Sequence, residues 1–305
     1  MTHIFIVNPQ AGYGGTARRL REQLEEIPDI RYYIFHTRPE QHADQLIREI
    51  MPLFEPEEKL RFYSCGGQGT ICSLMNGFDN LENVEIAMYP QGLTNDFLKM
   101  IDYEARSFRD IKNLIEGEVV KVDYIKTNHG CALNTLSVGL DAVVVKKMID
   151  YVNLSALGYK VPFALGMLFG VFVQKPLEYE YTIDGIKYKG PLTEFFFGNG
   201  HTLGDNLNFD PEASVLDGIA SCVTVPPNRG VKLLPSLLKL MSKDKDKLNQ
   251  CTTCIRATKF SIRRTNGEKI YVNLDGDLFE GHDYWEGEIV RGGLSLVVPK
   301  GVAVR

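Results

Sequence analysis

A glycine-rich turn between two apolar segments is the feature that most limits what this chain can fold into. Residues 66–70 read GGQGT, follow the apolar run 60–65, and precede a helix-like segment at 71–77 that a glycine closes. Glycines lack the Cβ atoms that keep a backbone away from a bound group, and successive N–H groups in such a turn can surround an anion. Strand, glycine turn and helix N-terminus, in that order, are how α/β proteins hold phosphate. The turn therefore predicts a protein that handles a nucleotide.

The composition argues against several classes of protein, namely nucleic-acid-binding, zinc-binding, secreted and membrane-spanning proteins. The chain has 305 residues, which allows two domains, and its net charge of −5 gives no reason to expect nucleic acid as a partner. Its six cysteines include one close pair, Cys251 and Cys254, without the second CxxC that a four-sulfur zinc site needs. The first residues lack a signal-peptide layout, so we expect a cytoplasmic protein. The uncharged stretch 161–173 is shorter than the ~20 residues of a membrane span and predicts a buried or interfacial helix.

The first 125 residues alternate between strand-like and helix-like segments. Such alternation predicts a parallel α/β sheet flanked by helices, whose ligands lie at the carboxyl ends of the strands. The predicted strands are 4–7, 31–35, 62–65 and 85–89, and the predicted helices between them are 16–24, 42–51 and 71–77.

The rest of the chain has a different texture. Short β-rich segments are separated by turns such as Asp184-Gly185 and Asn266-Gly267, which predicts an antiparallel β-domain. The predicted strands are 132–138, 178–183, 195–197, 219–225, 259–263 and 269–274, and one leucine-rich helix is predicted at 230–248. We place the nucleotide-binding domain at 1–125 and the β-rich domain at 126–292.

Four motifs in this order resemble the diacylglycerol kinase catalytic fold, best its bacterial lipid-kinase branch, to which sphingosine and ceramide kinases are related. The opening NPQAG at 8–12 looks like the family's NPxxG, and GGQGT at 66–70 stands where the family has GGDGT. PQGLTNDF at 90–97 is similar to PxGTxNDF, and DGD at 275–277 stands where the family has DGE. Two further stretches resemble the family more weakly. Residues 136–141 resemble a glycine-containing strand between its domains, and residues 211–218 resemble its PxAxxxDG motif.

The resemblance implies an NAD-kinase-like α/β domain completed by about 293–305, which includes the strand 295–298, and a β-sandwich that holds the lipid. It implies phosphoryl transfer from ATP with Mg²⁺ to a hydroxyl of diacylglycerol or a similar lipid, met at a membrane surface, in a chain that allows a homodimer. The implied catalytic residues are Asp275, Asp277 and Asp96. The implied nucleotide-binding residues are Asn8, Thr37, Gly66, Gly67, Gln68, Gly69, Thr70, Gly92, Thr94 and Asn95. The implied metal residues are Asp217, with the carbonyls of Ser214 and Ile219.

Two positions depart from the family pattern. Gln68 replaces an aspartate that would suit Mg²⁺, and a neutral amide supplies no charge to organise the metal. Leu93 stands where the family has threonine, with the hydroxyl displaced to Thr94. The chain is then a lipid kinase of altered or weak activity, a non-catalytic lipid- or nucleotide-binding protein, or a chain changed deliberately at this position.

Local structure offers another reading of each candidate. Asn8 and Gly12 also suit an ordinary turn, Thr37 a cap, and Asp96 the N-cap of a helix starting at Phe97. Asp275, which could accept the proton of a lipid hydroxyl, also suits an Asp-Gly hairpin turn. Asp217-Gly218 also suits a simple turn, and the helix 232–243 suits either an anionic membrane surface or its own sheet. An NAD kinase is another candidate, because it shares the glycine turn. The loop at 90–97, which is similar to the lipid-kinase motif, favours a lipid kinase over an NAD kinase.

Overall fold

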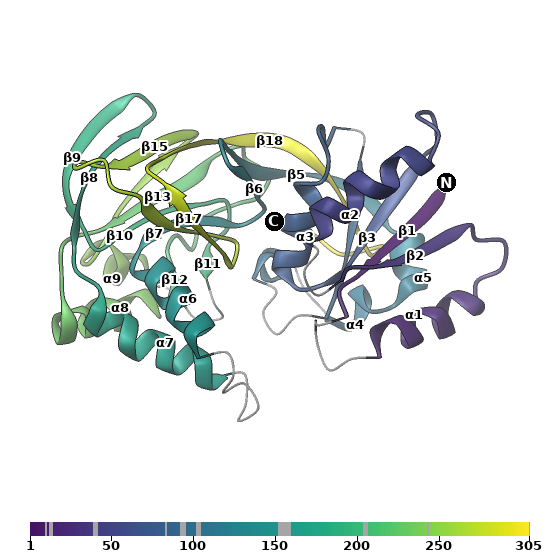
Figure 1. The fold of residues 1–305 in the computed structure, drawn as a ribbon, viewed down its shortest axis with the longest axis horizontal. Helices are drawn as coiled ribbons and strands as arrows, with labels where there is room; N and C mark the ends of the chain where they lie inside the picture. The colour runs from purple at the N-terminus through teal and green to yellow at the C-terminus, as the bar shows by residue number, and fades with distance from the viewer. Residues whose placement is uncertain are drawn as a thin grey trace. The chain divides into compact units, whose positions relative to one another are not determined.

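The computed structural model describes residues 1–9, 11, 15–38, 42–82, 84–91, 96–101, 105–151, 160–203, 207–242 and 244–304. The chain forms two compact units (Figure 1). The N-terminal unit comprises Met1–Tyr124, Val215–Asp217 and Arg291–Arg305, and the C-terminal unit comprises Ile125–Ser214 and Gly218–Val290. One ten-stranded sheet includes strands of both units through β18, and the C-terminal unit also has a separate six-stranded sheet.

The sheet of the N-terminal unit is parallel, in the strand order β2-β1-β3-β4-β18. Its central strand β1 is buried along its whole length, as parallel strands covered on both faces are. The C-terminal part of β18 joins through the pair Ser295↔Glu85, so the predicted strand at 295–298 completes this sheet. Its strands, with β5, which pairs with β18, are β1 (Thr2–Val7), β2 (Tyr32–His36), β3 (Leu60–Gly66), β4 (Glu85–Pro90), β5 (Glu118–Thr127) and β18 (Tyr284–Val298).

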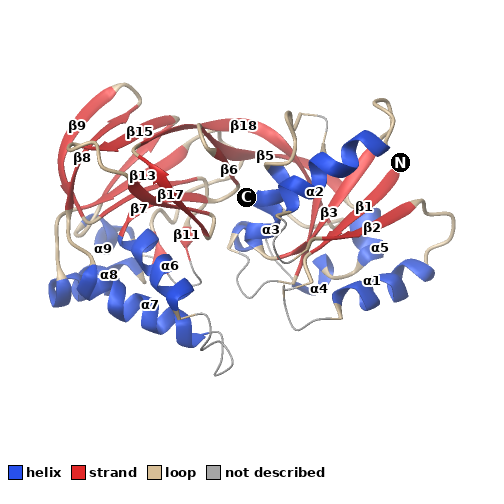
Figure 2. Ribbon diagram, viewed as in Figure 1, coloured by secondary structure: helices blue, strands red, loops and turns tan. Residues whose placement is uncertain are grey.

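The helices of this unit form two groups on opposite sides of the strands (Figure 2). One group is α1, α4 and α5, and the other is α2 and α3. The helices predicted at 16–24, 42–51 and 71–77 are confirmed as α1, α2 and α3, with ends that differ by at most three residues. The helices are α1 (Thr16–Glu25), α2 (Ala43–Ile50), η1 (Met51–Leu53), α3 (Gln68–Met75), η2 (Phe97–Met100), α4 (Ala105–Phe108) and α5 (Ile111–Ile115).

The C-terminal unit contains an antiparallel six-stranded sheet in the order β14-β13-β10-β7-β16-β17, and the N-terminal part of β18 continues into β15, β8 and β9. The predicted antiparallel β-domain is therefore confirmed. The turns at 184–185 and 266–267 are present as well. The strands are β6 (Gly130–Ala132), β7 (Thr135–Gly139), β8 (Leu177–Ile183), β9 (Ile186–Leu192), β10 (Glu194–Gly198), β11 (Thr202–Leu203), β12 (Leu207–Asn208), β13 (Ala220–Val225), β14 (Thr253–Ala257), β15 (Lys259–Arg264), β16 (Ile270–Leu274) and β17 (Asp277–His282).

Helices gather on one side of these strands (Figure 1). The sequence analysis missed α6 (Leu140–Asp150), which begins where β7 ends at Gly139. Gly139 has a φ of 121°, and a Cβ there would lie 2.4 Å from the Thr193 carbonyl, so the chain turns from strand to helix on a residue that must be glycine. The segment 136–141 is thus part strand and part helix, and the apolar stretch 161–173 is confirmed as helical in α7 (Lys160–Val173).

The single helix predicted at 230–248 is wrong. The segment forms three pieces, η4 (Gly230–Leu233), α8 (Leu234–Leu240) and α9 (Lys245–Asn249). Pro235 lies in the first turn of α8, where a proline is tolerated. Asp244 caps α9 by accepting hydrogen bonds from the backbone N–H groups of Asp246 and Lys247, which starts a new helix instead of continuing the old one. The leucine periodicity therefore predicted helical structure correctly, but three short helical segments form in place of one continuous helix.

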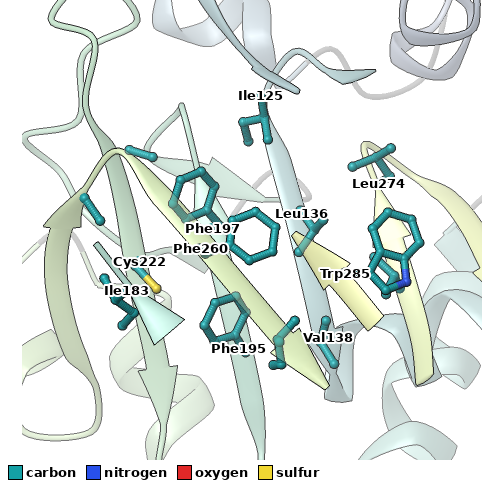
Figure 3. Close-up of a cluster of buried hydrophobic side chains, with 14 of the residues drawn as sticks. Ile125, Leu136, Val138, Ile183, Phe195, Phe197, Cys222, Phe260, Leu274 and Trp285 are labelled. Carbon is teal, nitrogen blue, oxygen red and sulfur yellow. The ribbon is translucent and has the colours of Figure 1, made fainter. Parts of the chain in front are cut away.

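The core of the C-terminal unit is aromatic. The rings of Phe197 and Phe260 lie 4.6 Å apart between centroids, and Phe195 and Trp285 belong to the same buried cluster (Figure 3). Aromatic pairs of this kind add to the stabilisation from buried area, which fixes the strands that hold the site. Among the residues described, no helix has both the length and the apolar character that crossing a bilayer requires.

Candidate active site

Three predicted nucleotide-binding segments meet at the carboxyl edge of the parallel sheet. Val7, the last residue of β1, pairs with His36 on one side and with Cys65 on the other. Consequently the backbone N–H of Asn8 donates to the Cys65 carbonyl at 3.1 Å, and that of Thr37 donates to the Val7 carbonyl at 3.0 Å. The sheet therefore brings Asn8, Thr37 and the glycine turn to one place, as the motif positions predicted.

The glycine turn joins buried strand β3 to helix α3. A Cβ at Gly66 would lie 2.7 Å from the Cβ of Thr70, closer than real side chains approach, so residue 66 must be glycine for the turn to close. Gly67 differs, because its backbone is extended (φ −92°, ψ −170°) and any residue can adopt that conformation. Gly69 lies in the first turn of α3, and the N–H of Thr70 donates to the Gly67 carbonyl at 3.1 Å. The required glycine is the first of the turn.

Gln68 ties the glycine turn to the loop that follows β4. Its side chain is buried, and its Oε1 accepts a hydrogen bond from the backbone N–H of Phe97 at 3.1 Å. A neutral amide thus stands at the N-terminus of α3, with its carbonyl oxygen engaged by the backbone. The residue that departs from the family pattern has a structural partner that the sequence did not indicate.

Asp96 is buried one residue before Phe97, and so lies beside the same contact. It occupies the N-cap position of η2, yet its side chain makes no capping hydrogen bond to that helix in the described part of the chain. The capping interpretation of Asp96 therefore lacks its hydrogen bond to η2 among the described residues.

Hydrogen bonds between polar side chains link the segments at this edge. The Nδ2 of Asn8 lies 3.4 Å from the Oγ1 of Thr70, at the limit of a hydrogen bond. Gln91 follows β4, and its N–H donates to the Gly66 carbonyl at 2.8 Å. Its Oε1 accepts from Arg19 at 2.9 Å, which places a guanidinium near the turn. The sequence analysis did not single out Gln91 or Arg19, although the position of Gln91 inside the motif 90–97 was a signal that could have found it.

Several predicted residues lie outside the described part of the chain. They are Gly12 of the first loop and Gly92, Leu93, Thr94 and Asn95 of the loop after β4. Their assignments stay predictions.

In the C-terminal unit, Asp275 and Gly276 form the two-residue turn between β16 and β17. Both have a positive φ, 53° for Asp275 and 99° for Gly276. This is the geometry of a tight hairpin turn, and Asp-Gly suits it because both residue types tolerate positive φ. The hairpin interpretation is therefore confirmed, and it is compatible with a functional aspartate because the side chain of Asp275 points into the unit.

The carboxylate of Asp275 is buried and held by three consecutive backbone N–H groups. Thr135 donates to Oδ1 at 2.8 Å, Asn134 donates to both oxygens at 3.1 and 3.0 Å, and Leu133 donates to Oδ2. These donors explain why the predicted strand 132–138 is broken at Leu133 and Asn134, since their N–H groups serve the carboxylate instead of a strand neighbour. The residues carry no motif, so the sequence did not reveal them.

A side-chain network continues from this turn into the unit. The N–H of Gly276 donates to Oδ1 of Asn273 at 2.8 Å, and Nδ2 of Asn273 donates to Asp141, which also accepts from Ser137. Asp277 begins β17 opposite Leu274 and is half-buried. The predicted pair Asp275 and Asp277 thus differs in exposure, with the first carboxylate fixed inside the unit and the second nearer the surface.

The predicted metal residues lie between β12 and β13. Asp217 is half-buried, and Gly218 after it has a φ of 76°, so a turn is present here. No group of three or more His, Cys, Asp or Glu side chains suited to a metal occurs among the described residues. The set of Ser214, Asp217 and Ile219 would use one carboxylate and two carbonyls, and it stays a prediction.

Known proteins resemble both the sequence and the fold. Residues 2–127 match the diacylglycerol kinase catalytic domain. The chain is 26% identical to a Staphylococcus carnosus protein named "Putative lipid kinase" over 71% of this chain and 70% of the relative. It is 22% identical to a diacylglycerol kinase of Staphylococcus aureus, over 72% and 69%.

A solved structure from Bacillus anthracis, described as a "putative diacylglycerol kinase", has a TM-score of 0.75 at 23% identity and covers 99% of this chain and 96% of that one. At this identity the structural likeness shows the fold. The motifs and the family match agree on the N-terminal part: residues 2–127 match the diacylglycerol kinase catalytic domain, and the chain is similar to bacterial lipid kinases.

Proposed function

We propose that this protein transfers the γ-phosphate of ATP to a hydroxyl group of diacylglycerol or a similar long-chain lipid. The observation that supports it most is the convergence of Asn8, Thr37 and the turn 66–70 on the carboxyl edge of a parallel sheet, where backbone N–H groups can approach phosphates. The relatives' names supply the lipid class. The lipid would be met at the inner face of the membrane by a cytoplasmic protein.

In this proposal the backbone of the glycine turn binds the phosphates, and Asn8 and Thr37 contact the nucleotide beside it. Gly92, Thr94 and Asn95 complete that site as the family motif implies. Arg19, held by Gln91, adds a positive charge near the phosphates. Positioning and electrostatic stabilisation are the main tasks of a phosphoryl-transfer enzyme.

Mg²⁺ would accompany the ATP phosphates, whose charge it neutralises. Asp96 would suit the metal, because it is a buried carboxylate within the motif 90–97 that follows β4. Gln68 fits it poorly, because it is neutral and its Oε1 already accepts the Phe97 N–H. Asp96 is therefore the residue of this unit that we expect to serve the metal, and Asp217 with Ser214 and Ile219 would hold a separate structural ion.

Asp275 would accept the proton of the lipid hydroxyl while the oxygen of that hydroxyl attacks the γ-phosphorus of ATP. The bond between the γ-phosphorus and the β–γ bridging oxygen breaks at the same time, and ADP is released. Three N–H donors fix both carboxylate oxygens, so the base would be held in one orientation. Asp277, half-buried on the same hairpin, would support this turn from the other strand.

A second function is favoured by Gln68. A site without the family's aspartate suits a protein that binds nucleotide and lipid and turns over slowly or not at all. The test is incubation of the purified protein with MgATP and a panel of lipids, followed by detection of the phosphorylated product. Transfer that Asp275→Asn abolishes supports the kinase, whereas nucleotide binding without transfer to any lipid supports the binding protein.

A further inference from the structure

Leu133 and Asn134 are two buried residues between β6 and β7, where the chain bends. Their N–H groups, together with that of Thr135, donate to the Asp275 carboxylate. In a regular strand successive N–H groups alternate between the two edges, so three of them cannot converge on one group there. Convergence needs a turn-like backbone that forms a concave anion site. The segment 133–134 must therefore be fixed in a conformation that a strand does not have.

Asn199 holds the opposite side of this segment. It follows directly after β10 and is fully buried. Its backbone N–H donates to the Asn134 carbonyl at 2.8 Å, and its side-chain Nδ2 donates to the Leu133 carbonyl at 2.9 Å. The carbonyl groups of the segment are thus bound by one residue, while its N–H groups are bound by one carboxylate. The segment 133–134 is fixed between Asn199 and Asp275.

The position of Asn199 is set by the centre of the six-stranded sheet. β10 and β7 are neighbours in that sheet, both are buried along their whole length, and Gly198 pairs with Thr135. Asp275 lies in the turn between β16 and β17, and β17 is an edge strand of the sheet. Groups on rigid, packed elements hold a site more precisely than groups on loops. The support therefore runs from Asn199 through the segment 133–134 to the carboxylate.

An asparagine suits this place better than other residues of similar size. Its side-chain amide is a neutral donor, so it binds a buried carbonyl without bringing a charge into the core. An aspartate would place a carboxylate oxygen against the Leu133 carbonyl, and an apolar side chain would take this donor away. A buried carbonyl that loses a donor costs free energy, so the segment would open more often and its N–H groups would leave Asp275.

We infer that Asn199 is a positioning residue: it fixes the carbonyls of Leu133 and Asn134 and thereby keeps three N–H groups directed at the Asp275 carboxylate. This inference rests on the proposed function for the task of Asp275 as the base. The role needs no contact between Asn199 and the reacting atoms. Asn199 acts through Asp275, because a base held in one orientation needs no rearrangement when the lipid hydroxyl gives up its proton.

Amide hydrogen exchange tests the segment without an enzyme assay. Asn199→Ala removes the Nδ2 donor, and Asn199→Ser is a second variant that also lacks it but keeps a polar group in the buried site. Thr252→Val is the matched control, because Oγ1 of buried Thr252 also donates to a backbone carbonyl at 2.9 Å, that of Leu248. We expect the amides of residues 133–135 to exchange about tenfold faster in both Asn199 variants, and within about twofold of the wild type in the control. Unchanged exchange in the Asn199 variants would overturn the inference.

Kinase assays with MgATP and sn-1,2-dioctanoylglycerol test the link to Asp275. We expect Asn199→Ala to lower kcat about tenfold and to leave KM for ATP within about twofold, whereas Thr252→Val changes neither. In a protein that already carries Asp275→Asn, Asn199→Ala should lower kcat by less than about twofold, because the carboxylate that it positions is gone. An equal fall of kcat in both backgrounds, or faster exchange with unchanged kcat, would overturn the inference.

Failure of this inference and failure of the proposed function give different results. A wild type that transfers phosphate to no lipid would overturn the kinase proposal alone, because hydrogen exchange still decides whether Asn199 holds the segment that binds Asp275. Melting curves identify a variant that does not fold, and the second Asn199 variant then takes its place in both experiments.

Discussion

The two units build their candidate sites from different materials. The N-terminal unit uses the backbone: adjacent parallel strands end at one edge, and a turn that needs glycine at Gly66 closes there. The C-terminal unit uses side chains from strands far apart in sequence, with Asp275 held by residues 133–135 and Glu194 linked to Asn273 through Asp141. A backbone site depends on a few consecutive residues, whereas a side-chain site depends on the whole sheet. Substitutions in the two units should therefore fail in different ways.

The largest effect is expected at Asp275. Asp275→Asn should lower kcat about 100-fold or more, because it removes the base, while ATP affinity stays within a few fold. It should also lower stability by about 1–3 kcal/mol, since the new amide would bring N–H groups against the N–H groups of residues 133–135. Enzyme assays and denaturant unfolding measure the two changes, and Asp283→Asn, at an exposed aspartate, is the matched control. A variant with most of its activity would remove Asp275 from the chemistry.

In the N-terminal unit, the substitution with the largest expected effect is at Gly66. Gly66→Ala should weaken ATP binding at least about tenfold and destabilise the unit by about 1–3 kcal/mol, because the new methyl group overlaps Thr70. Gly67→Ala should do much less, because the extended backbone at residue 67 accepts a side chain. Calorimetry with ATP and thermal melting compare the two. Equal losses of ATP affinity in the two variants would contradict this prediction, because they would show that packing against Thr70 does not distinguish Gly66 from Gly67.

A smaller effect is expected at Gln68, and the choice of acid matters. Gln68→Glu keeps the length of the side chain and an oxygen for the Phe97 N–H, and adds the charge that Mg²⁺ prefers. It should raise kcat several-fold and make nucleotide affinity depend on Mg²⁺. Gln68→Asp is one methylene shorter and should lose about 0.5–1.5 kcal/mol with the Phe97 contact. If neither acid changes the rate or the metal dependence, Gln68 does not limit activity.

The smallest effect is a pH dependence in the C-terminal unit. Because burial raises the pKa of Glu194 above 4.5 in the folded protein, the wild type loses stability as pH rises above about 4.5 toward the folded pKa. The glutamine of Glu194→Gln does not titrate. The unfolding free energy of the wild type should therefore fall relative to that of the variant between pH 4 and pH 8. The neighbouring carboxylate of Asp141 is present in both proteins. A difference that stays constant with pH would mean that Glu194 is ionised in the folded state.

The same contrast explains what the sequence could predict. Strands β1 to β4 and helices α1 to α3 were predictable because each has its own hydrophobic period and ends at a glycine or a polar turn. Helix α6 was missed because its Val143–Val145 run favours a strand by propensity, while the turn at Gly139 decides otherwise. Gln68 was singled out by its motif, but its contact with Phe97 depends on the fold of the next loop. Glu194 carried one signal, an acid directly before the buried run Phe195–Phe197.

Strand β18 is shared by the two units, and this has a consequence for the order of folding. Its first part pairs with β15 of the C-terminal unit and its last part with β4 of the N-terminal unit. On the ribosome, β4 is therefore made long before the strand that covers its edge, and an open edge invites pairing with other chains. A fragment that stops after β5 would keep this exposed edge permanently, so the N-terminal unit should be aggregation-prone by itself and should mature only late in synthesis.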